Sequence, residues 1–158
     1  MDAISELEHN ALWLIIDPWE KSPYDHDDAI GIDLARHNEV ILYNIVDYLP
    51  KLKHVMISCP LYENNKKINV HHSVKHLKNL NDNLSLLCSY LQKNNITSVV
   101  YMGFHHGRCI LTRSLSPIFL SQKINNLALY IKRDCVCTLP GDDELEADRK
   151  SLQYVKFI

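Results

Sequence analysis

One cysteine stands where a protein can stabilise a thiolate. In "YMGFHHGRCILTR", a strand-like run breaks at Gly103, a turn with a second glycine follows, and Cys109 begins an apolar run. The first turn of a helix offers free backbone N–H groups and the positive end of the helix dipole, and both favour the thiolate. The same groups can bind the oxyanion that forms when sulfur attacks a carbonyl. Cys109 is therefore a candidate nucleophile; the alternative is packing, the commoner role of a free cysteine.

A nucleophilic thiol needs a group that takes its proton and a cation that balances the charge. Asp17 closes the apolar run "ALWLIID" just before Pro18, and it fits the first role. Lys75 or Lys78 in the His-rich segment "VKHLKN" fits the second. Taken singly, these residues have plainer readings: the aspartate could cap a loop, and the lysines could belong to a solvated face.

The elements that must position these residues follow an alternating pattern. Short apolar runs bounded by turn residues predict strands, and runs with helical spacing lie between most of them. This pattern predicts one α/β domain over residues 1–158, a three-layer Rossmann-like fold with a mainly parallel six-strand sheet. The predicted strands are 11–17, 54–60, 68–74, 98–104, 128–134 and 154–158. The predicted helices lie in 38–50, 82–95, 108–122, bent or ended near Pro117, and 142–153, and Asp82 is the expected N-cap of the second.

Ligands of an open parallel sheet bind outside the carboxyl ends of its strands. Three features of this sequence lie where predicted strands end and are expected at that edge: Asp17, the segment 71–78 and the turn 103–109. The sequence thus predicts that the acid, the cation and the thiol meet there.

Composition excludes several classes of partner. The net charge is −2 and no basic block occurs, so we expect no nucleic-acid partner. No apolar stretch approaches the length of a membrane span, so we expect no membrane partner. Five cysteines form neither an even disulfide framework nor a paired CxxC pattern, which indicates free thiols and a cytoplasmic location.

Together, the ordered motifs resemble the isochorismatase-like cysteine hydrolases, which include nicotinamidases and N-carbamoyl-amide hydrolases. The resemblance runs from "ALWLIID" to "YVKFI". It includes the strand-ending aspartate, the glycine and five residues before the cysteine in "GFHHGRC", and the threonine and arginine in "CILTR". The family also has a cis peptide bond that would fall between Gly103 and His106. Two features depart from the family: Trp19 stands where a glutamine is common, and the stretch "VKHLKNLNDNLSLL", which holds the candidate lysines, contains no aromatic residue.

The resemblance implies a catalytic site and a reaction. Asp17, Lys75 and Cys109 would be catalytic, with Lys78 as the alternative lysine. The substrate would be a small molecule with an amide or related C–N bond. The alternative is a catalytically degenerate member that binds a small molecule or another protein. The expected pocket residues are Trp19, Phe104, His105, His106 and Arg108, although the two histidines could instead face solvent.

The resemblance also bears on metals and on assembly. Nicotinamidase-type relatives hold a metal through an Asp-x-His motif and a further histidine after the second strand. Here that region contains His71, His72 and His76 without the motif, and "YDHDD" lies in the first loop. We therefore expect neither a metal nor another cofactor. Because small α/β hydrolases often complete shallow clefts across a two-fold interface, we expect a homo-oligomer, and specifically a dimer.

Overall fold

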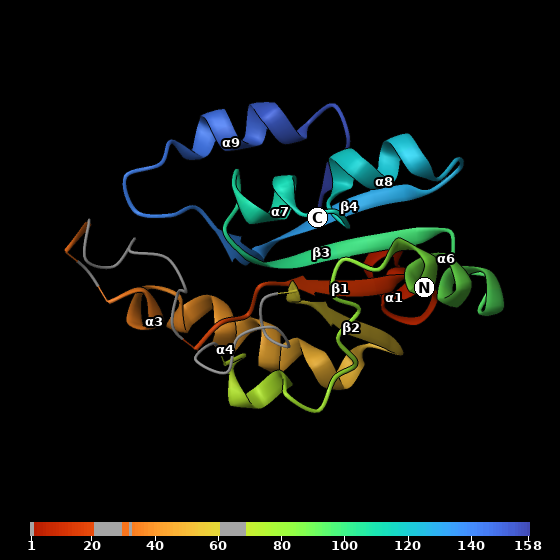
Figure 1. Ribbon diagram of the computed structural model, residues 1–158, viewed down its shortest axis with the longest axis horizontal. Helices are drawn as coiled ribbons and strands as arrows, with labels where there is room; N and C mark the ends of the chain where they lie inside the picture. Colours follow the sequence, from red (N-terminus) through yellow and green to blue (C-terminus); the bar gives the residue numbers. More distant parts are fainter. Residues whose placement is uncertain (1, 21–29, 32, 61–68) are drawn as a thin grey trace.

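A five-stranded parallel sheet forms the centre of the computed structural model, which describes residues 2–20, 30, 31, 33–60 and 69–158 (Figure 1). The strands run in the order β2-β1-β3-β4-β5. Their bounds are Leu12–Ile16 (β1), His54–Ser58 (β2), Ser98–Phe104 (β3), Ala128–Cys137 (β4) and Lys156–Phe157 (β5). The predicted α/β architecture and parallel sheet are confirmed, and five of the six predicted strands are present.

The sixth predicted strand, 68–74, is wrong over its described part. Val70 makes a single antiparallel bridge with Trp19, and His72–Val74 forms a 3₁₀ helix (η2). Residue 68 lies outside the described residues. The apolar residues that favoured a strand are used for packing instead, since Val70 and Val74 are both buried.

Helices cover both faces of the sheet. Figure 1 shows α7, α8 and α9 on one side and α3 and α4 on the other. The helices are α1 (Ala3–Asn10), α3 (Leu34–His37), α4 (Glu39–Tyr48), α6 (Leu84–Lys93), α7 (Cys109–Thr112), α8 (Pro117–Lys123) and α9 (Glu144–Ser151), with a 3₁₀ turn, η1, at Leu49–Lys51. Within the described residues, no helix is long and apolar enough to cross a bilayer.

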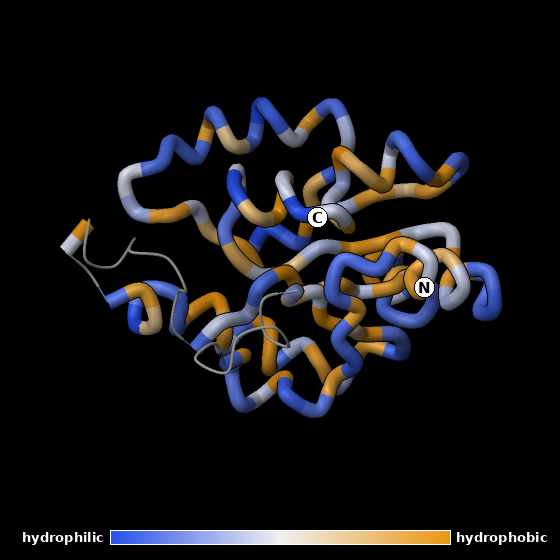
Figure 2. The backbone as a smooth tube through the Cα atoms, in the orientation of Figure 1, coloured by the Kyte–Doolittle hydropathy of each residue, from blue (hydrophilic) through white to orange (hydrophobic). Residues whose placement is uncertain are grey.

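The core lies on both faces of β1, whose five residues are all buried. Alternate side chains of a strand point to opposite faces. Leu12, Leu14 and Ile16 pack with the side chains of α6, α7 and α8, whereas Trp13 and Ile15 belong to the cluster on the α4 side. Figure 2 shows this pattern as a hydrophobic sheet between helices whose hydropathy alternates along the chain. Such continuous apolar runs are typical of parallel strands buried on both faces.

Two helix boundaries differ from the sequence prediction. The cap of α6 is Asn83, whose side chain accepts a hydrogen bond from the backbone N–H of Leu86 at 3.0 Å, rather than Asp82. The helix expected over 108–122 is two helices, because α7 ends at Thr112 and α8 begins at Pro117. Proline is favoured in the first turn of a helix, where its missing N–H is not needed.

The order of the strands reverses between β1 and β3. The chain passes from β1 to its neighbour β2 on one side and then crosses to β3 on the other. Ligands of open α/β sheets bind at such a switch point, at the carboxyl ends of the strands. Asp17 follows β1 and Cys109 follows β3, so this topology places both at the switch point.

Gly103 lets β1 and β3 approach closely at that point. It pairs with Ile16 and has φ of 111°. A Cβ atom built there would lie 2.1 Å from the carbonyl oxygen of Ile16. No side chain fits without separating the strands that carry Asp17 and Cys109.

We predict that Gly103→Ala destabilises the fold much more than Gly141→Ala. Gly141 also has a positive φ, of 90°, but a Cβ there would meet nothing within 4 Å. In the control Gly141→Ala, backbone strain alone should lower the free energy of unfolding, by about 1–3 kcal/mol. In Gly103→Ala, overpacking should lower the free energy of unfolding by roughly a further 1–3 kcal/mol. Urea unfolding measures both free energies, and equal losses would contradict the close-approach argument.

Candidate functional site

Asp17 and Cys109 meet at the switch point. Asp17 is fully buried and has φ of 45°. Its backbone N–H donates to the carbonyl of Ser58 at 3.1 Å, which fixes the residue beside the end of β2. Cys109 begins α7 and is half-buried. The thiol and the carboxyl lie close enough that each shifts the pKa of the other. The structure thus brings together two of the three residues predicted to be catalytic.

Arg113 supplies the cation beside Asp17. Its Nε atom lies 2.6 Å from Oδ2 of Asp17, and its guanidinium carbon lies 5.9 Å from the ring centroid of Trp19. Arg113 follows Cys109 by four residues, and its backbone N–H donates to the Cys109 carbonyl at 3.1 Å. Sequence reasoning noted this arginine in "CILTR" but did not place it in the site. The signal was available, because residues four apart on a helix lie on the same face.

The two candidate lysines lie elsewhere. Lys75 follows η2 directly, and the backbone carbonyl of Lys78 accepts a hydrogen bond from the N–H of Ile57 in β2 at 3.0 Å. Both side chains are exposed. Within the described residues, neither forms an ion pair, and the ion-pair partner of Asp17 is Arg113. The structure therefore does not bring Lys75 to Asp17.

Burial dominates the electrostatics of the acid and the thiol. It raises the pKa of Asp17 to about 6, although the charge of Arg113 acts in the opposite direction. Burial, with the neighbouring Asp17 charge, raises the pKa of Cys109 to about 12; Arg113 and a hydrogen bond from the backbone of His105 lower it. At neutral pH the proton accordingly resides on sulfur and the carboxylate is ionised. This is the resting state of a thiol beside a general base.

A second thiol, that of Cys59, borders the same carboxyl. Cys59 follows β2 and is fully buried, and its interaction with Asp17 also lowers the pKa of the acid. Asn79 fixes its backbone: the side-chain amide accepts from the N–H of Cys59 and donates to its carbonyl, both at 3.0 Å. Sequence reasoning missed this residue, although it follows a strand at the same edge as Asp17.

Of the predicted pocket residues, Trp19 lies beside the charged pair, with its ring facing Arg113. Phe104 is buried at the end of β3, and the peptide bond between Phe104 and His105 is cis, within the span expected from the family resemblance. Arg108 is exposed and forms a bidentate ion pair with Asp142, with N–O distances of 2.6 and 2.9 Å. Its charge is thus directed towards the loop before α9.

The two histidines between Phe104 and Gly107 are buried and hydrogen-bonded to other elements. The Nε2 atom of His105 lies 3.2 Å from Oδ1 of Asn38, just before α4. The Nε2 atom of His106 lies 2.8 Å from Oδ1 of Asp148 in α9. With exposures of 3% and 2%, neither ring faces solvent.

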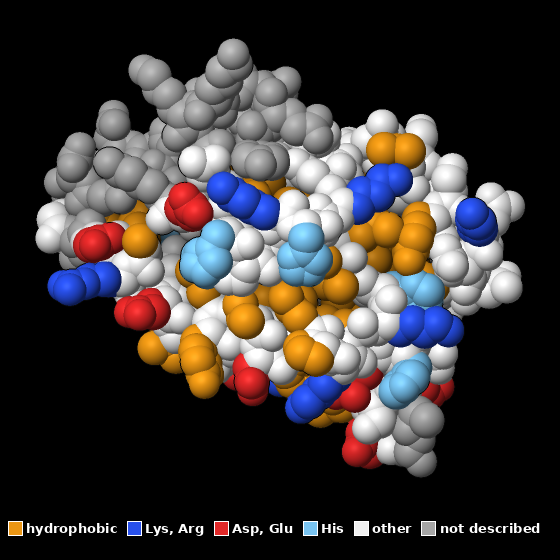
Figure 3. Space-filling view, turned by 90° about the horizontal axis from the view of Figure 1, so that it is seen from below, with side chains coloured by type: hydrophobic (Ala, Val, Ile, Leu, Met, Phe, Trp, Pro, Cys, Tyr) orange, Lys and Arg blue, Asp and Glu red, His pale blue; other side chains and the backbone are white. Residues whose placement is uncertain are grey.

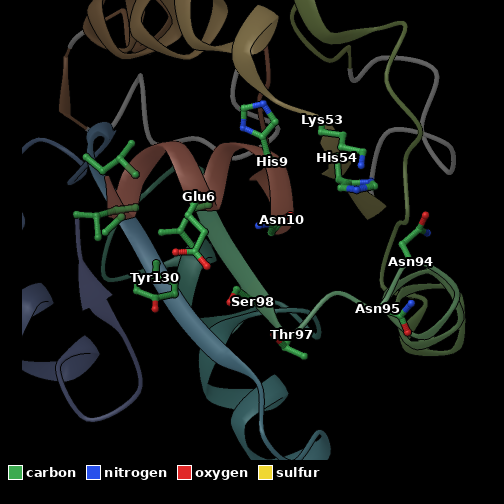
Figure 4. Close-up of a pocket in the computed structure, with 14 residues that line it drawn as sticks. Glu6, His9, Asn10, Lys53, His54, Asn94, Asn95, Thr97, Ser98 and Tyr130 are labelled. Carbon is green, nitrogen blue, oxygen red and sulfur yellow. The ribbon is translucent and has the colours of Figure 1, made fainter. Parts of the chain in front are cut away.

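A pocket of about 350 Å³ lies at the opposite end of the sheet (Figure 4). Its lining includes Glu6 of α1, His54 at the start of β2, Ser98 at the start of β3 and Tyr130 of β4. Because these are the amino ends of the strands, the pocket is separate from Asp17 and Cys109.

A metal site can be assessed only among the residues that the structure describes. Among them, no group of three or more His, Cys, Asp or Glu side chains is arranged to hold a metal ion. The "YDHDD" stretch, residues 24–28, lies outside them.

Comparison with known proteins gives a structural match. No protein-family model and no curated protein sequence matches the chain. YcaC from Escherichia coli, described as an octameric hydrolase of unknown specificity, matches with a TM-score of 0.54 and 11% identity over 94% of this chain and 74% of that one. YcaC from Pseudomonas aeruginosa, solved with hexane-2,5-diol and covalent acrylamide, matches with a TM-score of 0.56 and 11% identity over 94% and 75%. The chain therefore has the α/β fold of YcaC, which agrees with the α/β architecture that the sequence resemblance implied.

Proposed function

We propose that the protein is a cytoplasmic cysteine hydrolase that cleaves an amide or related C–N bond of a small molecule. The observation that carries this proposal is the Cys109 thiol beside the ionisable, buried carboxyl of Asp17 at the switch point of the sheet. A carboxylate that has lost its water shell in this way is a stronger base than an exposed one. The likeness to YcaC supports the fold, and the site residues support the chemistry.

In the first half of the reaction, Asp17 takes the thiol proton while sulfur attacks the carbonyl carbon. The resulting oxyanion would be held by the backbone N–H groups of Cys109 and His105. The N–H of Arg108 is not available for this, because it already donates to the carbonyl of His105 at 3.0 Å. As the C–N bond breaks, protonated Asp17 returns the proton to the leaving nitrogen, and a thioester remains on Cys109.

In the second half, Asp17 takes a proton from water, whose oxygen attacks the thioester. The acid product leaves and Cys109 recovers its proton. Arg113 would hold the carboxylate in place and compensate its charge throughout, the role that the family resemblance assigned to Lys75. We assign the role to Arg113 because it forms the ion pair with Asp17.

One observation favours the alternative, a degenerate member that binds without turnover. The Arg113 guanidinium holds one carboxylate oxygen of Asp17 at 2.6 Å, which weakens the carboxylate as a base. A protein with this pair and no turnover would still bind a small molecule at the same edge.

We also propose that the chain forms a homo-oligomer. The E. coli protein with this fold is described as octameric. On the face below the sheet, hydrophobic side chains gather at the surface (Figure 3). Helix α4 carries two exposed hydrophobic side chains three residues apart, Val40 and Tyr43, with exposures of 68% and 73%. Exposed apolar surface of this kind is typical of protein interfaces.

The first prediction of the proposed function concerns thiol reactivity. Acrylamide should alkylate Cys109 at least about tenfold faster than Cys88, because a neighbouring base activates one thiol and not the other. Sulfur adds to the β-carbon, and the α-carbon takes the proton that Asp17 removed. Mass spectrometry of peptides measures both rates in the same sample. Equal rates would contradict the activated thiol.

Hydrolysis assays on a set of variants distinguish an enzyme from a protein that only binds. Small amides, carbamoyl compounds and imides should be tested with the wild type, Cys109→Ala, Arg113→Ala and the matched control Lys75→Ala. Cys109→Ala should abolish hydrolysis, Arg113→Ala should reduce it, and Lys75→Ala should leave it unchanged. Binding without turnover in the wild type would support the degenerate member.

The second prediction concerns pH. Alkylation of Cys109 should fall as the pH drops through about 6, because protonated Asp17 cannot accept the thiol proton. Above that pH the rate should level off. In Asp17→Asn the thiol must ionise unaided, so the rate should instead rise about tenfold per pH unit. An identical profile in the variant would contradict the role of Asp17 as base.

The third prediction concerns assembly. Tyr43→Glu should shift the protein towards monomer in sedimentation, because a charge would be buried in the contact. Leu145→Glu is the matched control: Leu145 is 79% exposed but lies on α9, in the opposite layer. A monomeric wild type would contradict the proposal, and an unchanged Tyr43→Glu oligomer would contradict the α4 interface.

A further inference from the structure

The turn that delivers Cys109 to the site is attached to the fold on both sides. It covers residues 105–108, between β3 and α7. His105 reaches towards α4 and His106 towards α9, so consecutive side chains bind opposite layers of the molecule.

On the α4 side, Asn38 is the partner of His105. Asn38 is buried at the junction of α3 and α4. Its Oδ1 atom lies 3.2 Å from Nε2 of His105 and accepts from the thiol of Cys137 at 3.6 Å. A buried amide oxygen that meets two donors fixes the ring of His105. The backbone carbonyl of His105 in turn accepts from the N–H of Arg108 at 3.0 Å, which closes the turn before the thiol.

On the α9 side, Asp148 is the partner of His106. One carboxylate oxygen lies 2.8 Å from Nε2 of His106, and Arg133 contacts both oxygens at 3.2 and 3.1 Å. The Arg133 guanidinium also stacks on Phe157 at 4.0 Å, and the His106 ring meets the same aromatic ring edge-on at 5.7 Å. Because Arg133 holds the carboxylate, Asp148 presents a fixed acceptor to the histidine.

Gly107 brings α9 against the turn. A Cβ atom at Gly107 would lie 2.8 Å from Cβ of Ala147, and its φ is 85°. The helix therefore packs directly on the backbone two residues before Cys109. Asp148, the next residue of α9, is then in reach of His106.

We propose that His105 and His106 are positioning residues, which with Asn38 and Asp148 clamp the turn so that the backbone N–H of His105 faces the Cys109 sulfur. The inference rests on the proposed function, in which that N–H binds the oxyanion. It assigns to the two histidines a task other than the substrate contact that the sequence indicated. Each ring is hydrogen-bonded through Nε2 to an oxygen acceptor. The rings therefore affect the Cys109 thiol indirectly, by fixing the backbone of the turn.

The test compares the alkylation of Cys109 by acrylamide in variants, at one fixed pH, with Cys88 as the reference thiol in the same molecule. Asn38→Ala and Asp148→Ala remove the acceptors. Each variant should slow the alkylation of Cys109 about tenfold, since a hydrogen bond to a thiolate contributes about 1.5 kcal/mol. The rate of Cys88 should stay the same.

Conservative variants test whether the acceptor itself matters. Asn38→Asp and Asp148→Asn keep an oxygen at the same position, and both should restore at least half of the wild-type rate. Glu146→Ala is the matched control, because Glu146 lies on α9 but pairs only with Arg149 of the same helix among the described residues. This variant should leave the alkylation rates of both Cys109 and Cys88 unchanged. If the alanine variants fail to fold, His106→Leu and His106→Gln replace them: leucine removes the donor and should slow Cys109, whereas glutamine keeps a donor and should not.

The outcomes separate this inference from the proposed function. Unchanged or faster Cys109 alkylation in the alanine variants would overturn the clamp, as would equal slowing of Cys88. Hydrolysis that survives in Cys109→Ala would overturn the proposed function and leave the alkylation result unaffected.

Discussion

The close approach of β1 and β3 is the constraint on which the site depends. Backbone meets backbone where Ile16 pairs with Gly103, and there is no room for a side chain between them. The acid follows one of these strands and the thiol follows the other after a short turn. A wider separation would leave Asp17 and Cys109 as two unrelated residues at the edge of a sheet. The proximity of Asp17 and Cys109 thus depends on the glycine at position 103, which has no Cβ atom.

The second constraint is the cost of burying a carboxyl. A fully buried Asp17 would be neutral without a partner, since burial disfavours the charged form. Arg113, and to a lesser degree the thiols of Cys109 and Cys59, bring the pKa back to about 6, where ionisation at neutral pH is possible. The arginine serves this purpose without a loop lysine, because a guanidinium remains charged when it is partly buried. The Trp19 ring lies 5.9 Å from its guanidinium carbon, and Trp19 is the residue that stands where a glutamine is common in the family.

Patterns within short segments allowed most of the fold to be predicted from the sequence. The runs that became β1, β2 and β3 are apolar and sharply bounded, and the spacing from Gly103 to Cys109 places the thiol after its strand. Predictions failed where a long-range contact decided the outcome. Val70 is used for packing rather than for a strand, and the interruption of the 108–122 helix, which the sequence predicted near Pro117, begins earlier, after Thr112. The pairing of Asp17 with Arg113, 96 residues apart in the chain, has no local signature.

The shortness of α7 has a consequence for how the site can change. The helix has four residues, from Cys109 to Thr112, and Arg113 follows directly. The thiol and the cation therefore belong to one small rigid segment, while the acid belongs to the sheet. Any displacement of that segment would remove the thiol of Cys109 and the charge of Arg113 from Asp17 together, and of these three partners only Cys59 would remain beside the acid. The site is then cooperative: nucleophile and cation are gained or lost in one step, and an intermediate that retains only one of them is disfavoured.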